Sequence, residues 1–229
     1  MALGPREVMP EVGPSHSSAQ LRPTPPPRPT PFTPVCLAII GLSVLMYGLG
    51  ELFPETHQFG VLYGPAVRAG EWWRIGTFLV THGGIIHLLF NMSAVWTLGR
   101  ELEANIGSAR FLLLSAIGGI GSACFVLWLN PVAPTVGASG MILSWLGAML
   151  PLATKSGRSQ LLMFLGQTAL ISVLPGVSWA GHLGGVVFGL PCGFALMRGP
   201  TVFRYAGPVL LFVTAVLTFL AGNGGVRSS

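Results

Sequence analysis

The chain has 229 residues, of which 51% are hydrophobic and only 8% are charged, and its formal net charge is +5. A soluble domain of this length needs far more polar surface, so the composition excludes an ordinary soluble protein and predicts a membrane protein. The positive charge falls in the connections between apolar segments, and we therefore expect no nucleic-acid partner.

The beginning of the chain predicts a flexible tail. Leu21 to Pro34 reads LRPTPPPRPTPFTP, and so many prolines favour polyproline II or disorder over helix. A binding site for a PxxP-recognising partner is one interpretation of this stretch, and a plain flexible tail is the other. No Arg-rich and Ser-rich presequence is visible, and the first apolar run starts too far along the chain for an ordinary signal peptide.

Apolar runs bounded by charged residues, Pro or Gly predict seven membrane spans. Two stretches without any charged residue, 111–154 and 159–197, are each long enough for two spans, because one span needs about 20 apolar residues. The predicted spans are Val35–Phe53, Ile85–Leu98, Arg110–Leu129, Val136–Ala153, Gln160–Leu174, Trp179–Met197 and Tyr205–Ala221. The fold class is therefore an all-α polytopic membrane helical bundle.

The basic residues predict the orientation of these spans. Of the 12 basic residues, only Arg68, Arg74 and Arg227 fall on one side of a seven-span arrangement, and the remaining nine share the side of the N-terminus. Because basic residues prefer the cytoplasmic side, we expect the N-terminus inside and the C-terminus outside. The compact chain without a presequence favours a bacterial plasma (inner) membrane.

Three polar clusters mark the starts of the second, fourth and sixth spans. They are THGGIIHLLFN (Thr81–Asn91), VGASGMILS (Val136–Ser144) and WAGHLGGVVFG (Trp179–Gly189). Polar groups are costly inside a membrane and are usually functional there. All three spans begin on the outer face in the predicted orientation, so the clusters predict one functional site at that depth.

Two stripes of small residues predict how the fourth and sixth spans pack. His182, Gly185 and Gly189 share one face of the sixth span, and a stripe that begins at Gly140 follows Ser139 on the fourth. Small residues allow membrane helices to approach closely. Packing the stripes together would therefore bring His182 beside Ser139.

Ser139 and His182 predict a nucleophile and its base, because a hydroxyl must lose its proton to attack. Ser139 lies in the first turn of its predicted helix, where free N–H groups and the helix dipole can stabilise an oxyanion. His87 and Asn91, four residues apart on one helical face, can supply further donors. A Gly-x-Ser-Gly motif is weak evidence alone in a chain with 32 glycines, so the interpretation depends on the three clusters together.

Other catalytic chemistries are excluded by residue type. The chain contains no Asp, which excludes an aspartyl dyad and a Ser-His-Asp triad, and it has no His-Glu-x-x-His zinc motif. We therefore expect a Ser-His dyad, no metal and no organic cofactor. The three cysteines, Cys36, Cys124 and Cys192, lie in apolar segments and are expected to be buried hydrophobic residues.

From Gly70 to Gly193 the motifs resemble those of the rhomboid intramembrane proteases. The similar elements are Trp73-Arg74 in the first loop, His82, His87 and Asn91 in HGGIIHLLFN, Glu103 in LGRELEANIGSARF, the motif GASG at Gly137–Gly140, and GHLGGVVFG from Gly181 to Gly189. The resemblance implies a six-helix rhomboid core, with one extra C-terminal transmembrane helix. We accordingly expect three parts: the tail at 1–34, the core at 35–200, and the seventh helix with a short tail at 201–229.

The resemblance also implies an activity and its site. A rhomboid is an intramembrane serine endopeptidase, so the resemblance implies a Ser139–His182 dyad that cleaves single-pass or polytopic membrane proteins in the lipid bilayer. It implies His87, Asn91 and the Ser139 backbone amide as the oxyanion hole, with His82 in a supporting role. It gives no oligomeric state. Leu143 departs from the pattern, because many family members have an aromatic residue there that stacks on the histidine.

Two alternatives to an enzyme remain. A catalytically dead relative would bind membrane segments and control their traffic, but it would be expected to lose Ser139 or His182. A small transporter or channel would distribute its polar residues along a path to the inner face, whereas here they cluster at one predicted depth.

Overall fold

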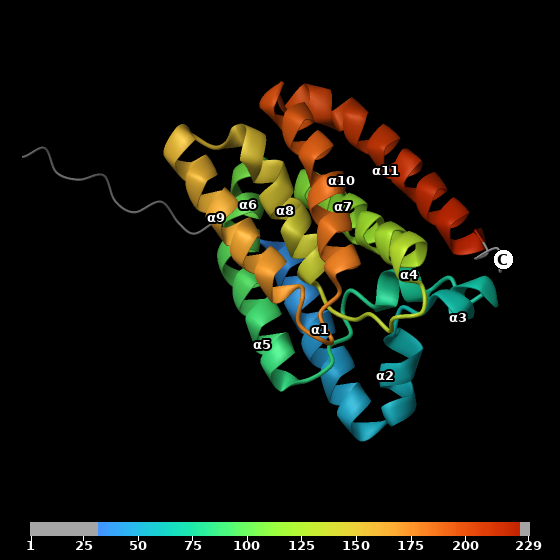
Figure 1. Cartoon of the computed structure of the whole chain (residues 1–229). Helices are drawn as coiled ribbons and strands as arrows, with labels where there is room; N and C mark the ends of the chain where they lie inside the picture. The colour runs from blue at the N-terminus through green and yellow to red at the C-terminus, as the bar shows by residue number, and fades with distance from the viewer. Residues whose placement is uncertain (1–31, 225–229) are drawn as a thin grey trace, which may run out of the picture. The chain divides into compact units, whose positions relative to one another are not determined.

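The computed structural model describes residues 32–224, which form a helical bundle without a β-strand (Figure 1). Most of the predicted tail at 1–34 lies outside the described residues. The described helices are α1 (Pro34–Leu52), α2 (Pro54–Gly60), α3 (Gly64–Arg68), α4 (Arg74–Thr77), α5 (Ile85–Ala94), the π-helical turn η1 (Val95–Gly99), α6 (Arg100–Ile106), α7 (Ser108–Leu129), α8 (Ser139–Leu152), α9 (Lys155–Ile171), α10 (Trp179–Met197) and α11 (Pro200–Asn223). The all-α prediction is confirmed.

The long helices follow the predicted spans. Within residues 32–224, four helices are long and apolar enough to cross a membrane, namely α1, α7, α10 and α11. Helix α8 is also apolar but has only 14 residues. It begins at Ser139 rather than at the predicted Val136, because Gly137 has a φ of +116°, which no right-handed helix contains.

The second predicted span is longer as a helix than its apolar run. The prediction ended at Leu98, but α5, η1 and α6 follow one another from Ile85 to Ile106. The segment RELEAN in α6 is charged but rich in good helix formers, so the helix continues where the apolar run stops. The first loop, residues 53–84 between α1 and α5, contains the short helices α2 to α4, which no sequence pattern predicted. Figure 1 shows them gathered at one end of the bundle.

Helices α7, α8 and α10 form the centre of the bundle. The side chain of Trp145 in α8 is fully buried, stacks at a tilt against Phe111 of α7 at 4.9 Å, and donates a 3.0 Å hydrogen bond to the Ser115 hydroxyl. A Cβ at Gly118 would lie 1.8 Å from Oγ of Ser144, so α7 and α8 are nearly in backbone contact. The distance between the core helices is therefore determined by small residues such as Gly118 as much as by large ones such as Trp145.

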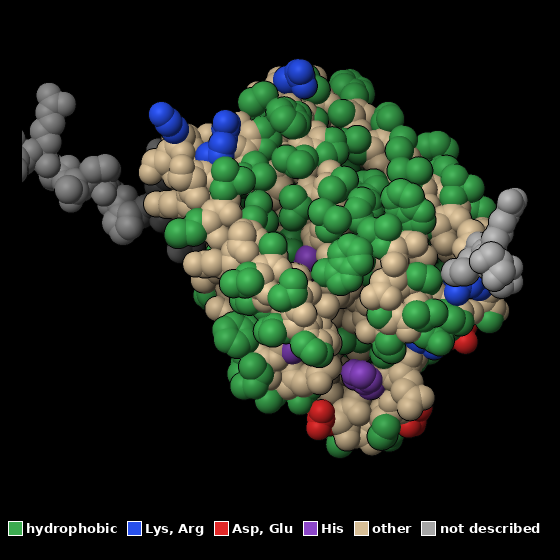
Figure 2. Space-filling model, viewed as in Figure 1, with side chains coloured by type: hydrophobic (Ala, Val, Ile, Leu, Met, Phe, Trp, Pro, Cys, Tyr) green, Lys and Arg blue, Asp and Glu red, His purple; other side chains and the backbone are tan. Residues whose placement is uncertain are grey.

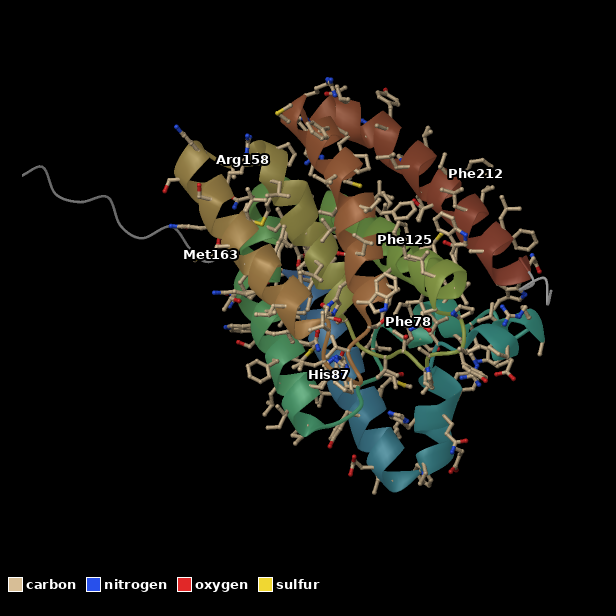
Figure 3. All side chains as sticks on the ribbon, in the orientation of Figure 1. Phe78, His87, Phe125, Arg158, Met163 and Phe212 are labelled. Atoms are coloured by element: carbon tan, nitrogen blue, oxygen red, sulfur yellow. The ribbon has the colours of Figure 1, made fainter. Side chains whose placement is uncertain are left out.

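Helix α11 packs along α7 and α10 on the outside of this centre (Figure 1). The hydroxyl of Thr218 donates to the carbonyl of Ile120 in α7 at 3.2 Å. Near the end of α11, Phe219 stacks on Trp72 of the first loop at 5.3 Å. The face of α11 that is turned away from α7 and α10 carries exposed apolar side chains such as Phe212, which points away from the bundle in Figure 3.

The surface is apolar between charged ends, as a lipid-facing protein requires. Figure 2 shows hydrophobic side chains over most of the visible face, with Lys and Arg near the top and again at the lower right, and acidic side chains at the bottom and lower right. Lys155 and Arg158 at the start of α9 are exposed, as is Glu51 near the end of α1.

Glu103 of α6 binds the first turn of α1 through hydrogen bonds. Its side chain is 1% exposed and accepts hydrogen bonds from the backbone N–H groups of Val35 at 3.0 Å and Cys36 at 2.9 Å, in the first turn of α1. Burial alone would raise the pKa of this carboxyl. The hydrogen bonds from Cys36, from the Ser108 hydroxyl and from Val35 favour the charged form and hold its pKa below the ordinary value.

Glu103→Gln is expected to lower the free energy of unfolding by about 2 kcal/mol at neutral pH, because charged hydrogen bonds to a helix N-terminus are lost. A lowered pKa contributes stability above the ordinary carboxyl pKa, and that contribution disappears as the pH falls through the folded value. The difference between wild type and variant should therefore shrink in acid. Unfolding in mixed micelles across a pH series measures it.

Glu101→Gln is the matched control, since Glu101 lies in the same helix but is exposed. We expect it to change the unfolding free energy by less than about 0.5 kcal/mol. Equal stability of the two variants at neutral pH would contradict the role assigned to Glu103.

Candidate active site

The loop before α8 holds the motif GASG in a sharp turn. The positive φ of Gly137 reverses the chain, and its N–H donates to the carbonyl of Phe78 in the first loop at 2.8 Å. Helix α8 starts directly afterwards, and the N–H of Ile142 bonds the carbonyl of Ala138 at 2.9 Å. Ser139 is thus the first helical residue, and the N–H groups of that turn have no acceptor within the helix.

The start of α10 positions His182. The hydroxyl of Ser178 caps this helix by accepting from the N–H of Gly181 at 3.3 Å, and it also accepts from the Thr135 hydroxyl at 3.3 Å. His182 therefore lies in the first turn of α10, at the same end of the bundle as Ser139. Its Nε2 lies 2.8 Å from Oγ of Ser139, which is hydrogen-bond distance.

Glycines bring α8 and α10 together behind this pair. A Cβ at Gly185 would lie 1.9 Å from the carbonyl oxygen of Gly140, and one at Gly189 would lie 2.1 Å from that of Ser144. Both distances are far below any real contact of a Cβ with an oxygen, so only glycine fits at these positions. The two stripes identified in the sequence are in backbone contact.

His87 of α5 lies against the nucleophile loop. A Cβ at Gly137 would lie 2.6 Å from Cε1 of the His87 ring, so the loop and the imidazole pack directly. Figure 3 shows His87 far along the bundle from Arg158, which stands at the other end. His87 is half-buried and lies next to GASG, and its role as an oxyanion donor stays a prediction.

Asn91 lies one turn further along α5 and is buried. Its Nδ2 donates to the carbonyl of His87 at 2.9 Å. A side-chain amide has two N–H donors, so one is used within the helix and a second remains. The role of Asn91 as an oxyanion donor stays a prediction.

His82 packs edge-on against His87, with 5.2 Å between ring centroids. Its side chain is 1% exposed, and its Nδ1 lies 3.3 Å from the carbonyl of Val80. Its Nε2 has no hydrogen-bond partner among the described residues. His82 also lines a polar cavity of about 260 Å³ beside Tyr47, Glu51 and His57.

Trp73 and Arg74 organise the first loop. The Arg74 guanidinium pairs with Glu71 and donates to the backbone carbonyls of Gln58 and Val61 at 2.5 and 2.6 Å. Trp73 stacks on Phe59 at 5.2 Å. These contacts lie within the first loop. Trp73 and Arg74 therefore stabilise the loop whose Phe78 carbonyl accepts from Gly137, and they do not contact Ser139 or His182.

Two serines at the site were not singled out from the sequence. Ser122 of α7 is buried beside the nucleophile motif, and a Cβ at Gly140 would lie 2.1 Å from its Oγ. Ser172, just after α9, lies 2.6 Å from Nδ1 of His182. No local pattern marks either serine, because each is brought to the site by helix packing alone.

Leu143, at the position that the resemblance associates with an aromatic residue, is buried in α8. Within the described part of the chain, no group of three or more His, Cys or Glu side chains is arranged to hold a metal ion. The three cysteines are buried and free. Chemically, the site offers a hydroxyl in hydrogen-bond contact with an imidazole, beside a helix N-terminus and a second histidine.

Known proteins share a large part of this sequence. The Rhomboid domain family model matches residues 69–199. Rhomboid protease GluP of Bacillus subtilis (strain 168) is 34% identical over 195 residues, which are 77% of this chain and 38% of the relative. RHOMBOID-like protein 6, mitochondrial, of Arabidopsis thaliana is 38% identical over 162 residues, covering 66% of this chain and 53% of the relative. Rhomboid-like protease 5 of Toxoplasma gondii is 32% identical over 149 residues, covering 60% of this chain and 18% of the relative.

The chain spans only 38 to 55% of the length of the first three relatives. The family match nevertheless covers more than half of this chain, from the first loop to the end of α10. The helical bundle, the apolar surface and these matches identify an integral membrane protein. The chain belongs to the rhomboid family.

Proposed function

We propose that this protein is an intramembrane serine endopeptidase that cleaves membrane proteins through a Ser139–His182 dyad. The observation that carries the proposal is the 2.8 Å contact between Oγ of Ser139 and Nε2 of His182 at the start of α8. His182 takes the proton of Ser139 as the hydroxyl attacks a peptide carbonyl. His182 then protonates the leaving amine, and water releases the acyl-enzyme.

The oxyanion that forms on attack requires donors at the same place. The Ser139 N–H belongs to the first turn of α8, where the helix dipole favours negative charge. The ring of His87 packs against Gly137, two residues before Ser139, and the second amide N–H of Asn91 is available. These three groups form the proposed oxyanion hole.

Substrates are single-pass or polytopic membrane proteins. An intact transmembrane helix hides its carbonyls in its own hydrogen bonds, so a substrate must expose its scissile bond. Segments with helix-breaking or small residues near the outer face meet this condition. The orientation proposed from the basic residues, with the N-terminus in the cytoplasm, puts the site towards the outer face of a plasma (inner) membrane.

The test is cleavage of a model single-pass protein by the purified chain in detergent. Wild type is expected to release two fragments, with the cut in or next to the transmembrane segment, and Ser139→Ala is expected to release them at least about 10³-fold more slowly. Cleavage by Ser139→Ala at the wild-type rate would reject the serine nucleophile. Binding of the model protein by wild type without any cleavage would instead favour a non-enzymatic relative.

A further inference from the structure

His182 has a second polar contact besides Ser139. Its Nδ1 lies 2.6 Å from Oγ of Ser172, which follows α9 and is 6% exposed. The same Oγ lies 2.7 Å from the backbone carbonyl of Thr168, one turn earlier in α9. The atoms thus form a chain from the Thr168 carbonyl through Ser172 and the imidazole to Ser139.

The direction of these hydrogen bonds follows from the groups themselves. A carbonyl oxygen only accepts, and a serine hydroxyl has one hydrogen, so the 2.7 Å contact with Thr168 is a hydrogen bond only when Ser172 donates that hydrogen to the carbonyl. In that arrangement the oxygen of Ser172 accepts from Nδ1, and the imidazole proton lies on Nδ1. Nε2 keeps its lone pair and faces the Ser139 hydroxyl at 2.8 Å. This is the tautomer that a general base needs.

The chain lacks the groups that usually orient a catalytic histidine. An aspartate performs this task in a Ser-His-Asp triad, where losing it costs about 10⁴-fold through the wrong tautomer. This chain has no Asp at all, and Leu143 offers no ring to stack on the imidazole. Ser172 is the neighbour in contact with Nδ1.

We propose that Ser172 is a positioning residue that holds His182 in the Nδ1-protonated tautomer. This inference rests on the proposed Ser139–His182 dyad. Ser172 does not touch the reacting atoms but acts through His182. A neutral hydrogen bond is weaker than that of a carboxylate, so we expect Ser172→Ala to lower kcat about tenfold rather than 10⁴-fold.

The experiment measures two reactions of the full chain in detergent. The first is kcat and KM for the model single-pass protein. The second is the rate at which a small fluorophosphonate probe labels Ser139, which needs the base but no transmembrane substrate. Ser172→Ala is expected to lower kcat and the labelling rate by about tenfold each, with KM unchanged. Ser172→Thr keeps a hydroxyl and is expected to recover most of the loss.

Ser159→Ala is the matched control. Ser159 also bonds a carbonyl one turn earlier in α9, that of Lys155 at 3.3 Å, but it is exposed near the opposite end of that helix. We expect both rates to stay at the wild-type value. A loss of cleavage in Ser172→Ala with normal probe labelling would overturn the proposal, because the serine would then act on α9 or the substrate rather than on His182.

Nitrogen-15 NMR of labelled histidine gives an independent readout. Wild type is expected to show a protonated Nδ1 on His182, and Ser172→Ala a mixture of tautomers. An unchanged spectrum would overturn the proposal even if the variant were less stable. Failure of the dyad itself is recognised separately, because Ser139→Ala would then cleave and label like wild type.

Discussion

His182→Ala is expected to lower kcat for cleavage of a single-pass protein by at least about 10³-fold, with little change in KM. The Ser139 hydroxyl is a poor nucleophile with its proton in place, and Nε2 of His182, at 2.8 Å, is the group in position to remove it. In an unrelated serine protease, loss of either member of the Ser-His pair costs about 10⁶-fold. Initial-rate measurements in detergent give kcat and KM separately.

The double variant, Ser139→Ala with His182→Ala, sharpens this test. When two residues act as one catalytic unit, removing either one removes the whole contribution of the unit to kcat. The double variant should therefore be no slower than either single variant. If the losses in kcat of the two single variants multiply in the double variant, the residues contribute independently and the assignment of a dyad is wrong. Thermal unfolding of each variant checks that the bundle is intact.

Gly185→Ala is expected to lower the free energy of unfolding by about 3 kcal/mol and kcat by at least about 100-fold. The added Cβ would lie 1.9 Å from the carbonyl oxygen of Gly140, and a backbone atom cannot rotate away. Helices α8 and α10 must therefore separate, and they carry Ser139 and His182. Overpacking costs 1–3 kcal/mol or more, and a misplacement of about 1 Å at a catalytic pair costs about 100-fold.

Gly166→Ala supplies the control with the same chemical change. Gly166 lies within α9, and nothing lies within 4 Å of its added Cβ. Because alanine favours helix, we expect this variant to be as stable as wild type or up to about 1 kcal/mol more stable. Unfolding in mixed micelles compares the two variants. Equal stability of the two would show that the contact between α8 and α10 tolerates a methyl group.

Several features of this protein could be predicted from local sequence. Helix α10 occupies the predicted span Trp179–Met197, and α7 ends at the predicted Leu129, because apolar runs bounded by polar or helix-breaking residues define spans. The stripe of Gly185 and Gly189 predicted the face of α10 that packs. Periodicity reports which residues share a face, and that information is present in a single helix.

The loops and helix ends were less predictable. Helices α2 to α4 are too short to show a period, and their stability comes from contacts such as the bonds of Arg74 to the loop backbone. The helical continuation through α6 was missed because charge ends an apolar run but not a helix.

Residue types and their spacing were enough to predict an all-helical membrane protein of the rhomboid family, with a serine and a histidine at the starts of two helices that can pack closely. The neighbours that surround these two residues depend on how the helices pack, and no sequence pattern predicted them. Glu103 caps α1 from 67 residues away along the chain, and Ser172 reaches His182 across the turn between α9 and α10. Neither contact has a local signal, because a hydrogen bond between distant segments depends on how whole helices pack.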